Sequence, residues 1–135
     1  MQIDQEQKTR LTQAVMRLLK SWQLPSEAQI ALLGLPAGAR KRSVRKFQQG
    51  GALPDGEQTW ERVDHLIGIA DALRTSYPAH PEFGSIWIKQ RNRKLRGRTP
   101  LDCMLEDGMP GFVQVRSHLD CAWSWQRDEE YHREW

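Results

Sequence analysis

The 135-residue chain has little of what marks secreted, membrane-spanning or disulfide-stabilised proteins. Its two cysteines, Cys103 and Cys121, show no Cys-x-x-Cys spacing and do not form a disulfide framework. The longest uncharged apolar run, Ile30–Pro36, is far shorter than the roughly 20 residues that span a bilayer. The first residues, Met-Gln-Ile-Asp-Gln-Glu, lack the basic and apolar stretches of a secretory signal. We therefore expect a soluble cytoplasmic protein.

Motifs for catalysis or metal binding are also scarce. The sequence has no P-loop, no GxGxxG after a strand and no recognisable pair of catalytic carboxylates. His118 and Cys121 stand three residues apart and could begin a zinc site, but a structural site needs four ligands. Cys103 is better interpreted as a small buried apolar residue. We therefore expect no catalytic residue, no metal and no cofactor.

Two clusters of positive charge are the most conspicuous feature that is present. Residues 40–46, the first basic cluster, hold five Lys or Arg, and residues 89–98, the second basic cluster, hold six, with no acid in either. The remaining 118 residues carry nine basic and seventeen acidic side chains, so the net charge of +3 conceals a strong asymmetry. Such clusters favour contacts with polyanions at defined places, and a solvated helix face is the alternative for each.

Apolar residues recur at helical spacing along the chain, and no stretch alternates as a strand would. The sequence therefore predicts an all-α protein, with a helix-turn-helix bundle followed by a small helical domain. Capping signals and prolines predict a first helix ending before Pro25, then helices over 27–33 (with Ser26 as N-cap), 39–49 and 57–76, a short helix opening at Pro81, and helices over 101–106 (after Thr99 and Pro100) and from Pro110.

The order of a short helix, a turn of about four residues and a basic helix is typical of a helix-turn-helix, whose second helix lies in the DNA major groove. Val44 and Phe47 would pack inward, leaving polar and basic residues to contact phosphates and base edges. A small helical bundle with a solvated face is the alternative. The predicted DNA-binding residues are Arg40, Lys41, Arg42, Ser43, Arg45 and Lys46.

Further along, residues 61–69 read ERVDHLIGI, Trp87-Ile88 precedes Asn92, residues 95–102 read LRGRTPLD, and Val115-Arg116 precedes Leu119. In this order, from about residue 57 to 123, the chain resembles the Xre/MbcA/ParS antitoxins, and 95–102 is similar to their [FL]-x-G-x-[ST]-P-L-D signature. Residues 32–35 resemble the family's Xre-like helix-turn-helix. The turn after them lacks the Ser and Thr caps of many relatives, and Phe47 stands where relatives often have Trp.

The resemblance implies a type II antitoxin in which residues 1–56 bind operator DNA, residues 57–123 bind and inhibit a toxin, and residues 124–135 form a tail. The toxin is usually a RES-domain protein that consumes NAD. In this family the end of the chain can reach into the toxin's cleft, which tail aromatics such as Tyr131 would suit. The implied toxin-binding residues are Trp87, Asn92, Leu95, Arg96, Gly97, Arg98, Pro100, Leu101, Arg116, Trp123, Trp125 and Trp135.

Several of these residues also have a purely structural interpretation, since Gly97 suits a backbone turn and Pro100 a helix start. An unstructured tail is the alternative to a cleft-binding one. For the whole chain, the alternatives are a helix-turn-helix transcriptional regulator with no toxin partner and an RNA-binding module that uses the second basic cluster. We expect a homodimer or a higher hetero-oligomer with the toxin, and an acidic protein surface opposite the second basic cluster.

Overall fold

The computed structural model describes residues 4–36 and 38–120, and these residues form helices and connecting loops without a strand. A single isolated bridge pairs Asn92 with Arg98. The prediction of an all-α fold is therefore confirmed. The chain divides between Ile67 and Gly68 into two compact units, unit 1 and unit 2, each described by itself below.

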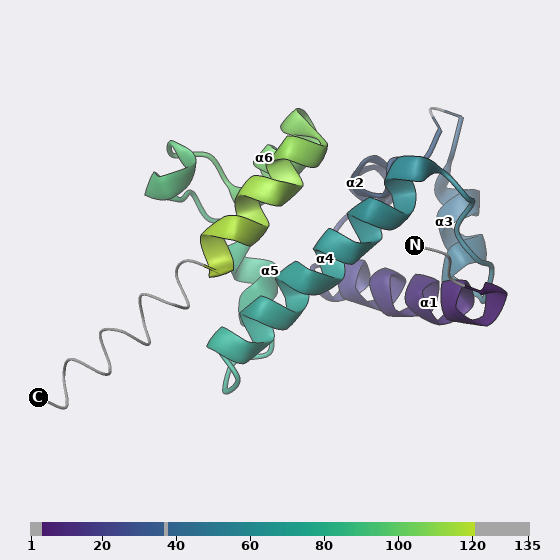
Figure 1. Cartoon of the computed structure of the whole chain (residues 1–135), viewed down its shortest axis with the longest axis horizontal. Helices are drawn as coiled ribbons and strands as arrows, with labels where there is room; N and C mark the ends of the chain where they lie inside the picture. The colour runs from purple at the N-terminus through teal and green to yellow at the C-terminus, as the bar shows by residue number, and fades with distance from the viewer. Residues whose placement is uncertain (1–3, 37, 121–135) are drawn as a thin grey trace, which may run out of the picture. The chain divides into compact units, whose positions relative to one another are not determined.

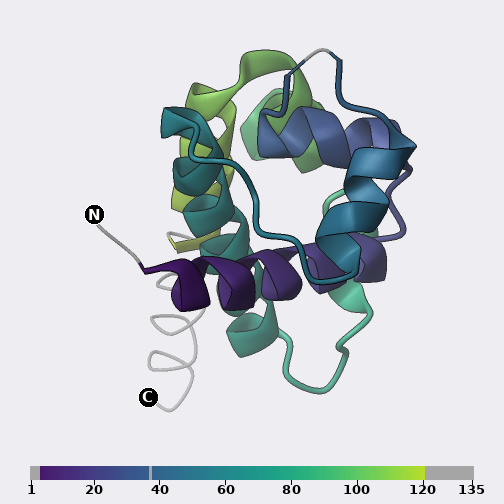
Figure 2. The ribbon, with the colours of Figure 1, turned by 90° about the vertical axis from the view of Figure 1, so that its right-hand side faces the viewer.

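Unit 1 consists of three helices and the first part of a fourth. These are α1 (Gln5–Ser21), α2 (Ser26–Leu33), α3 (Lys41–Gln48) and the start of α4 (Glu57–Ser76). Helix α3 packs against both α1 and α2, and the three can be followed from purple to blue in Figure 1 and from a second side in Figure 2. The buried apolar residues include Val15, Leu19, Trp22, Leu32, Leu33, Val44, Phe47, Val63 and Leu66.

The ends of these helices follow local sequence signals, with two corrections. Asp4 caps α1 by accepting a hydrogen bond from the Gln7 amide at 2.7 Å. Helix α2 begins at Ser26 with Pro25 at its N-cap, so the prediction of Ser26 as N-cap is wrong by one residue. Helix α3 begins at Lys41 rather than residue 39, because Arg40 is extended. The connection between α2 and α3 is therefore seven residues long, 34–40, and exceeds the predicted turn.

Polar contacts tie the connecting segments of unit 1 to its helices. The Thr12 hydroxyl accepts from the Leu53 amide at 3.1 Å, which anchors the segment before α4 to α1. The Arg62 guanidinium donates to the Ala31 carbonyl at 3.3 Å and so satisfies the C-terminal end of α2. Its aliphatic and guanidinium atoms lie against Gly34, where a Cβ would stand 2.9 Å from Nε. The first turns of α4 thus pack within unit 1.

Unit 2 contains the rest of α4 and four shorter elements. These are α5 (Phe83–Trp87), the 3₁₀ helix η1 (Arg93–Leu95), α6 (Pro100–Asp107) and a helix over residues 109–120. The Thr99 side chain caps α6 and Pro100 is its first residue, as predicted. The buried apolar residues are Ile69, Leu73, Trp87, Ile88, Leu95, Cys103, Met104, Phe112, Val115 and Leu119.

Helix α4 spans the division between the two units, since its residues up to Ile67 belong to unit 1 and those from Gly68 to unit 2. The domain boundary predicted from the sequence lies at residue 56, ahead of this helix. That boundary remains a prediction about independently folding parts. None of the described helices combines the length and apolarity needed to cross a membrane.

A glycine determines how closely α6 and the following helix approach each other. A Cβ placed on Gly111 would stand 2.0 Å from the Cys103 carbonyl oxygen and 2.7 Å from its carbonyl carbon. Both atoms are backbone, so no side-chain rotation can relieve the overlap. The approach therefore requires glycine at this position.

We expect Gly111→Ala to lower the free energy of unfolding by roughly 2 kcal/mol or more, because the two helices must move apart. Urea unfolding followed by circular dichroism measures the loss. The control is Gly38→Ala, whose Cβ would meet no atom within 4 Å and which should change stability by less than about 0.5 kcal/mol. Equal stability of the two variants would contradict the close approach.

Candidate functional site

The loop over residues 92–98, which we call the motif loop, is closed on itself by Asn92. The Asn92 amide donates to the Arg98 carbonyl at 3.1 Å, and the Asn92 carbonyl accepts from the Leu95 and Gly97 amides at 3.0 and 2.9 Å. The Asn92 side-chain oxygen also accepts from the Lys94 amide at 3.0 Å and caps η1. One residue therefore joins both ends of the loop and its centre.

The turn at the end of the motif loop uses two left-handed residues in succession. Arg96 has φ 60° and Gly97 has φ 77°. A Cβ on Gly97 would meet nothing within 4 Å, so glycine is favoured here by backbone conformation and not by lack of space. This turn brings the chain back to Thr99 and the start of α6.

Three predicted toxin-binding residues of this region are buried in unit 2. Trp87, Leu95 and Pro100 are shielded from solvent, and Leu95 is only 2% exposed. Leu101 is half-buried, and its amide donates to the Ile88 carbonyl at 2.9 Å, which attaches the start of α6 to the residue after α5. These residues hold the motif loop in place.

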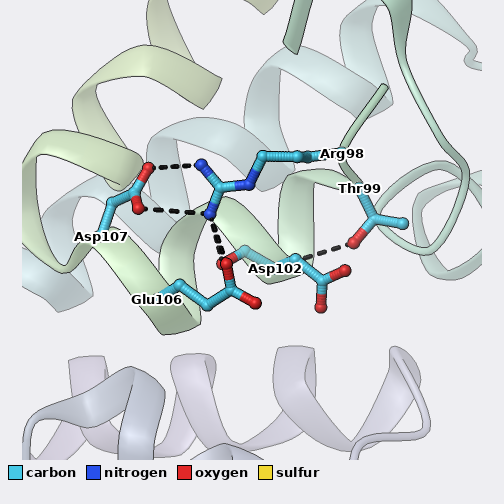
Figure 3. Close-up of polar contacts among 5 residues, drawn as sticks. All are labelled: Arg98, Thr99, Asp102, Glu106 and Asp107. Atoms are coloured by element: carbon cyan, nitrogen blue, oxygen red, sulfur yellow. Dashed lines mark hydrogen bonds and ion pairs between the residues drawn. The ribbon is translucent and has the colours of Figure 1, made fainter. Parts of the chain in front are cut away.

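Arg98 closes the other side of the motif loop through a fork of charged hydrogen bonds, shown in Figure 3. Its guanidinium donates to both Asp107 oxygens at 2.8 and 3.2 Å and to Glu106 Oε2 at 2.7 Å. The bond from Arg98 lowers the pKa of Asp107, and the bond to Asp107 raises the pKa of Arg98. Arg98 is thus paired within the domain, whereas the other cations of its cluster form no ion pair among the described residues.

His118 completes the support of the motif loop from the helix over residues 109–120. Its ring stacks on Trp87 with centroids 6.2 Å apart, and Nε2 lies 3.0 Å from Asn92 Nδ2. Because the Asn92 oxygen already accepts from Lys94, Nδ2 faces the ring as a donor and Nε2 must accept, which requires a neutral imidazole. Burial, and then the charge of Lys94, lower the pKa of His118 accordingly.

From its sequence position, His118 is predicted only as a possible zinc ligand, and the contact with Asn92 is not predicted. The only available signal was its position three residues after Val115 on a predicted helix, which does not identify a partner in a distant loop. Cys121, the other half of that pair, lies outside the described residues. Across residues 4–36 and 38–120 no three potential ligands gather in one place. Cys103 is buried, and burial raises the pKa of its thiol.

The Arg116 head group lies against α4 at the position of Gly68. A Cβ on Gly68 would stand 2.5 Å from the Arg116 guanidinium carbon, so the absence of a side chain at Gly68 makes room for the Arg116 head group. Arg116 is half-buried and belongs to the packing of unit 2. The remaining predicted residues Trp123, Trp125 and Trp135, together with Tyr131, lie outside the described residues.

The first basic cluster has the distribution that the sequence predicts for α3. Val44 and Phe47 are buried, and all five cations are exposed. No ion pair engages any of them among the residues that the structure describes. Ser43 is half-buried and lies at the start of the helix, where its hydroxyl accepts from the Arg40 amide at 3.5 Å.

Comparison with known protein families assigns this part of the chain to a domain family. Residues 72–121 match the family model of the antitoxin Xre/MbcA/ParS C-terminal toxin-binding domain. The motif loop, Arg98, His118 and α6 all lie within the match, so unit 2 carries a toxin-binding domain. The chain accordingly carries the toxin-binding domain of an Xre/MbcA/ParS-like antitoxin of a toxin–antitoxin system. No curated protein and no solved structure matches the chain.

The neutral His118 makes stability dependent on pH. Its pKa in the folded state lies below the ordinary value of about 6.5, so the unfolded chain takes up a proton first as the pH falls. The free energy of unfolding should therefore decrease from about pH 7 downward until the folded-state pKa is passed. Urea midpoints between about pH 7.5 and 5.5 measure this slope, and His118→Gln should flatten it. His80→Gln, at an exposed site, is the control and should keep the wild-type slope; an unchanged slope in His118→Gln would contradict the assignment.

Proposed function

We propose that this antitoxin binds and inhibits a RES-domain toxin that consumes NAD, acting in the cytoplasm by binding and without catalysis of its own. The observation that carries the proposal is the motif loop. The signature residues of a toxin-binding family form one closed, internally bonded loop between α5 and α6, and the family match covers it completely. The RES class comes from the resemblance of residues 57–123.

The predicted toxin-binding residues divide into two roles under this proposal. The buried or internally bonded ones, such as Asn92, Leu95 and Arg98, shape the loop and position it. Those with accessible surface, such as Arg96 and Leu101, would contact the toxin. The aromatic residues of the tail would add anchors of the kind that dominate interface energetics. The assembly would be a homodimer or a larger complex with the toxin.

Co-expression of the chain with the product of a neighbouring RES-domain gene should restore growth and yield a stable complex on pull-down. Gly97→Val should weaken the complex by about tenfold or more, because a β-branched residue at φ 77° distorts the motif loop. Gly38→Ala serves as a matched control in unit 1 and should behave as wild type. Absence of a complex with the wild-type chain at micromolar concentration would refute the proposal.

We also propose that α3 binds operator DNA. Its four cations and the preceding Arg40 are exposed and have no ion pair among the described residues, and the apolar side of the helix packs on α1 and α2. Charges in this arrangement neutralise phosphates, and arginines can also read guanine. The alternative, a DNA-binding regulator without a toxin partner, shares this surface and differs in the outcome of the co-expression experiment.

Replacing Arg42 and Arg45 by Ala should weaken operator binding and reduce the slope of log affinity against log salt by about 2, since about one phosphate contact is lost per residue. Toxin neutralisation should remain. Arg17→Ala with Lys20→Ala removes the same charge from the exposed side of α1 and should leave operator binding within about twofold of wild type. Fluorescence anisotropy over a salt series gives both quantities. Joint loss of DNA binding and neutralisation in a folded variant would contradict the assignment of DNA binding to α3 alone.

A further inference from the structure

Five cations of the second basic cluster, which we call the outer cations, are exposed around the motif loop: Lys89, Arg91, Arg93, Lys94 and Arg96. None of them forms an ion pair with any residue in the described part of the chain. Residues 83–101 contain no acidic side chain at all. Within residues 83–101 no acidic side chain therefore offsets their mutual repulsion.

The nearest acids in sequence, Glu82 and Asp102, form no ion pair with the outer cations among the described residues, and the next two are committed to Arg98. Glu106 and Asp107, on the last turn of α6, both accept from Arg98. This pairing distinguishes Arg98, which supports the loop, from the five outer cations, which form no ion pair with the described residues.

The outer cations are held on a rigid support. Arg93 and Lys94 lie in η1, which the Asn92 side chain caps, and Leu95 is buried beneath them. Arg96 lies in the left-handed turn that the Gly97 amide closes onto the Asn92 carbonyl. A backbone fixed in this way loses little conformational freedom on binding, so a partner gains more from these cations than from those of a flexible basic segment.

An apolar side chain adjoins the cations. Ile86 is 52% exposed, and the Lys89 amide donates to the Ile86 carbonyl at 3.1 Å, so both residues belong to the same turn at the end of α5. A phosphate backbone offers nothing to an exposed isoleucine, whereas protein interfaces combine an apolar centre with charged surroundings. The surface is therefore better suited to a protein than to a nucleic acid.

We propose that the outer cations and Ile86 form a docking surface for an acidic patch of the toxin. The inference rests on the proposed function and extends it, because it names the surface that is used and the chemistry of the partner that fits it. Charge complementarity of this kind mainly accelerates association and selects the partner.

The test compares two charge reversals of equal size, Arg91→Glu with Arg93→Glu on the docking surface and Arg17→Glu with Lys20→Glu on α1. The probe is the RES-domain product of the neighbouring gene, and surface plasmon resonance at about 50 and 500 mM salt gives the association rates. We expect the Arg91/Arg93 variant to associate at least about tenfold more slowly at low salt, with the difference shrinking to about threefold at high salt. The α1 variant should stay within about twofold of wild type.

Ile86→Ser supplies a second measurement that salt does not affect. It should speed dissociation from the probe and leave the affinity for a 20-base-pair duplex of arbitrary sequence unchanged. Wild-type rates in both Arg91/Arg93 and Ile86 variants would overturn the inference while the proposed function stands. If the Arg91/Arg93 variant lost duplex binding and bound the probe like wild type, the inference would be overturned in favour of nucleic acid. A wild-type chain that does not bind the probe would refute the proposed function and this inference together.

Discussion

The bonds made by Asn92 hold together the part of the molecule that carries its function. Its backbone closes the motif loop onto Arg98 and Gly97, and its side chain caps η1 on one side and meets His118 on the other. Because the amide oxygen and nitrogen have opposite hydrogen-bonding roles, this geometry selects a neutral imidazole at His118. The stacking of His118 on Trp87 then connects the loop to α5. A residue that could not both donate and accept would break one of these connections.

The net charge of +3 conceals two groups of exposed cations. In the second basic cluster, Arg98 is committed to the acids of α6, and its neighbours remain exposed and unpaired within the described residues. In the first basic cluster, the cations of α3 are likewise exposed, above a buried side formed by Val44 and Phe47. One chain thus carries two separate cationic surfaces, one in each unit. An antitoxin that binds both DNA and a toxin would use them independently.

Close packing in unit 2 depends on glycines at two positions. Gly111 allows the backbone of one helix to meet the Cys103 carbonyl of another, and Gly68 allows the Arg116 head group to lie against α4. These contacts place α4, α6 and the helix over residues 109–120 against one another and so define the frame that holds the motif loop. Substitution at Gly111 would alter the frame through backbone atoms, and substitution at Gly68 would displace the Arg116 head group.

Local sequence determined the helices and most of their ends. Apolar spacing predicted α1 and α4, and Thr99 with Pro100 predicted the start of α6, because capping and periodicity act within a few residues. Only the tertiary structure decided that Arg98 pairs with Asp107 while Arg96 has no ion pair among the described residues, that His118 accepts from Asn92, and that α4 belongs to both units. The cluster at residues 89–98 looks uniform in sequence, since each cation has the same local surroundings. Contacts between residues far apart in the chain separate its members, and those contacts exist only once the helices have packed.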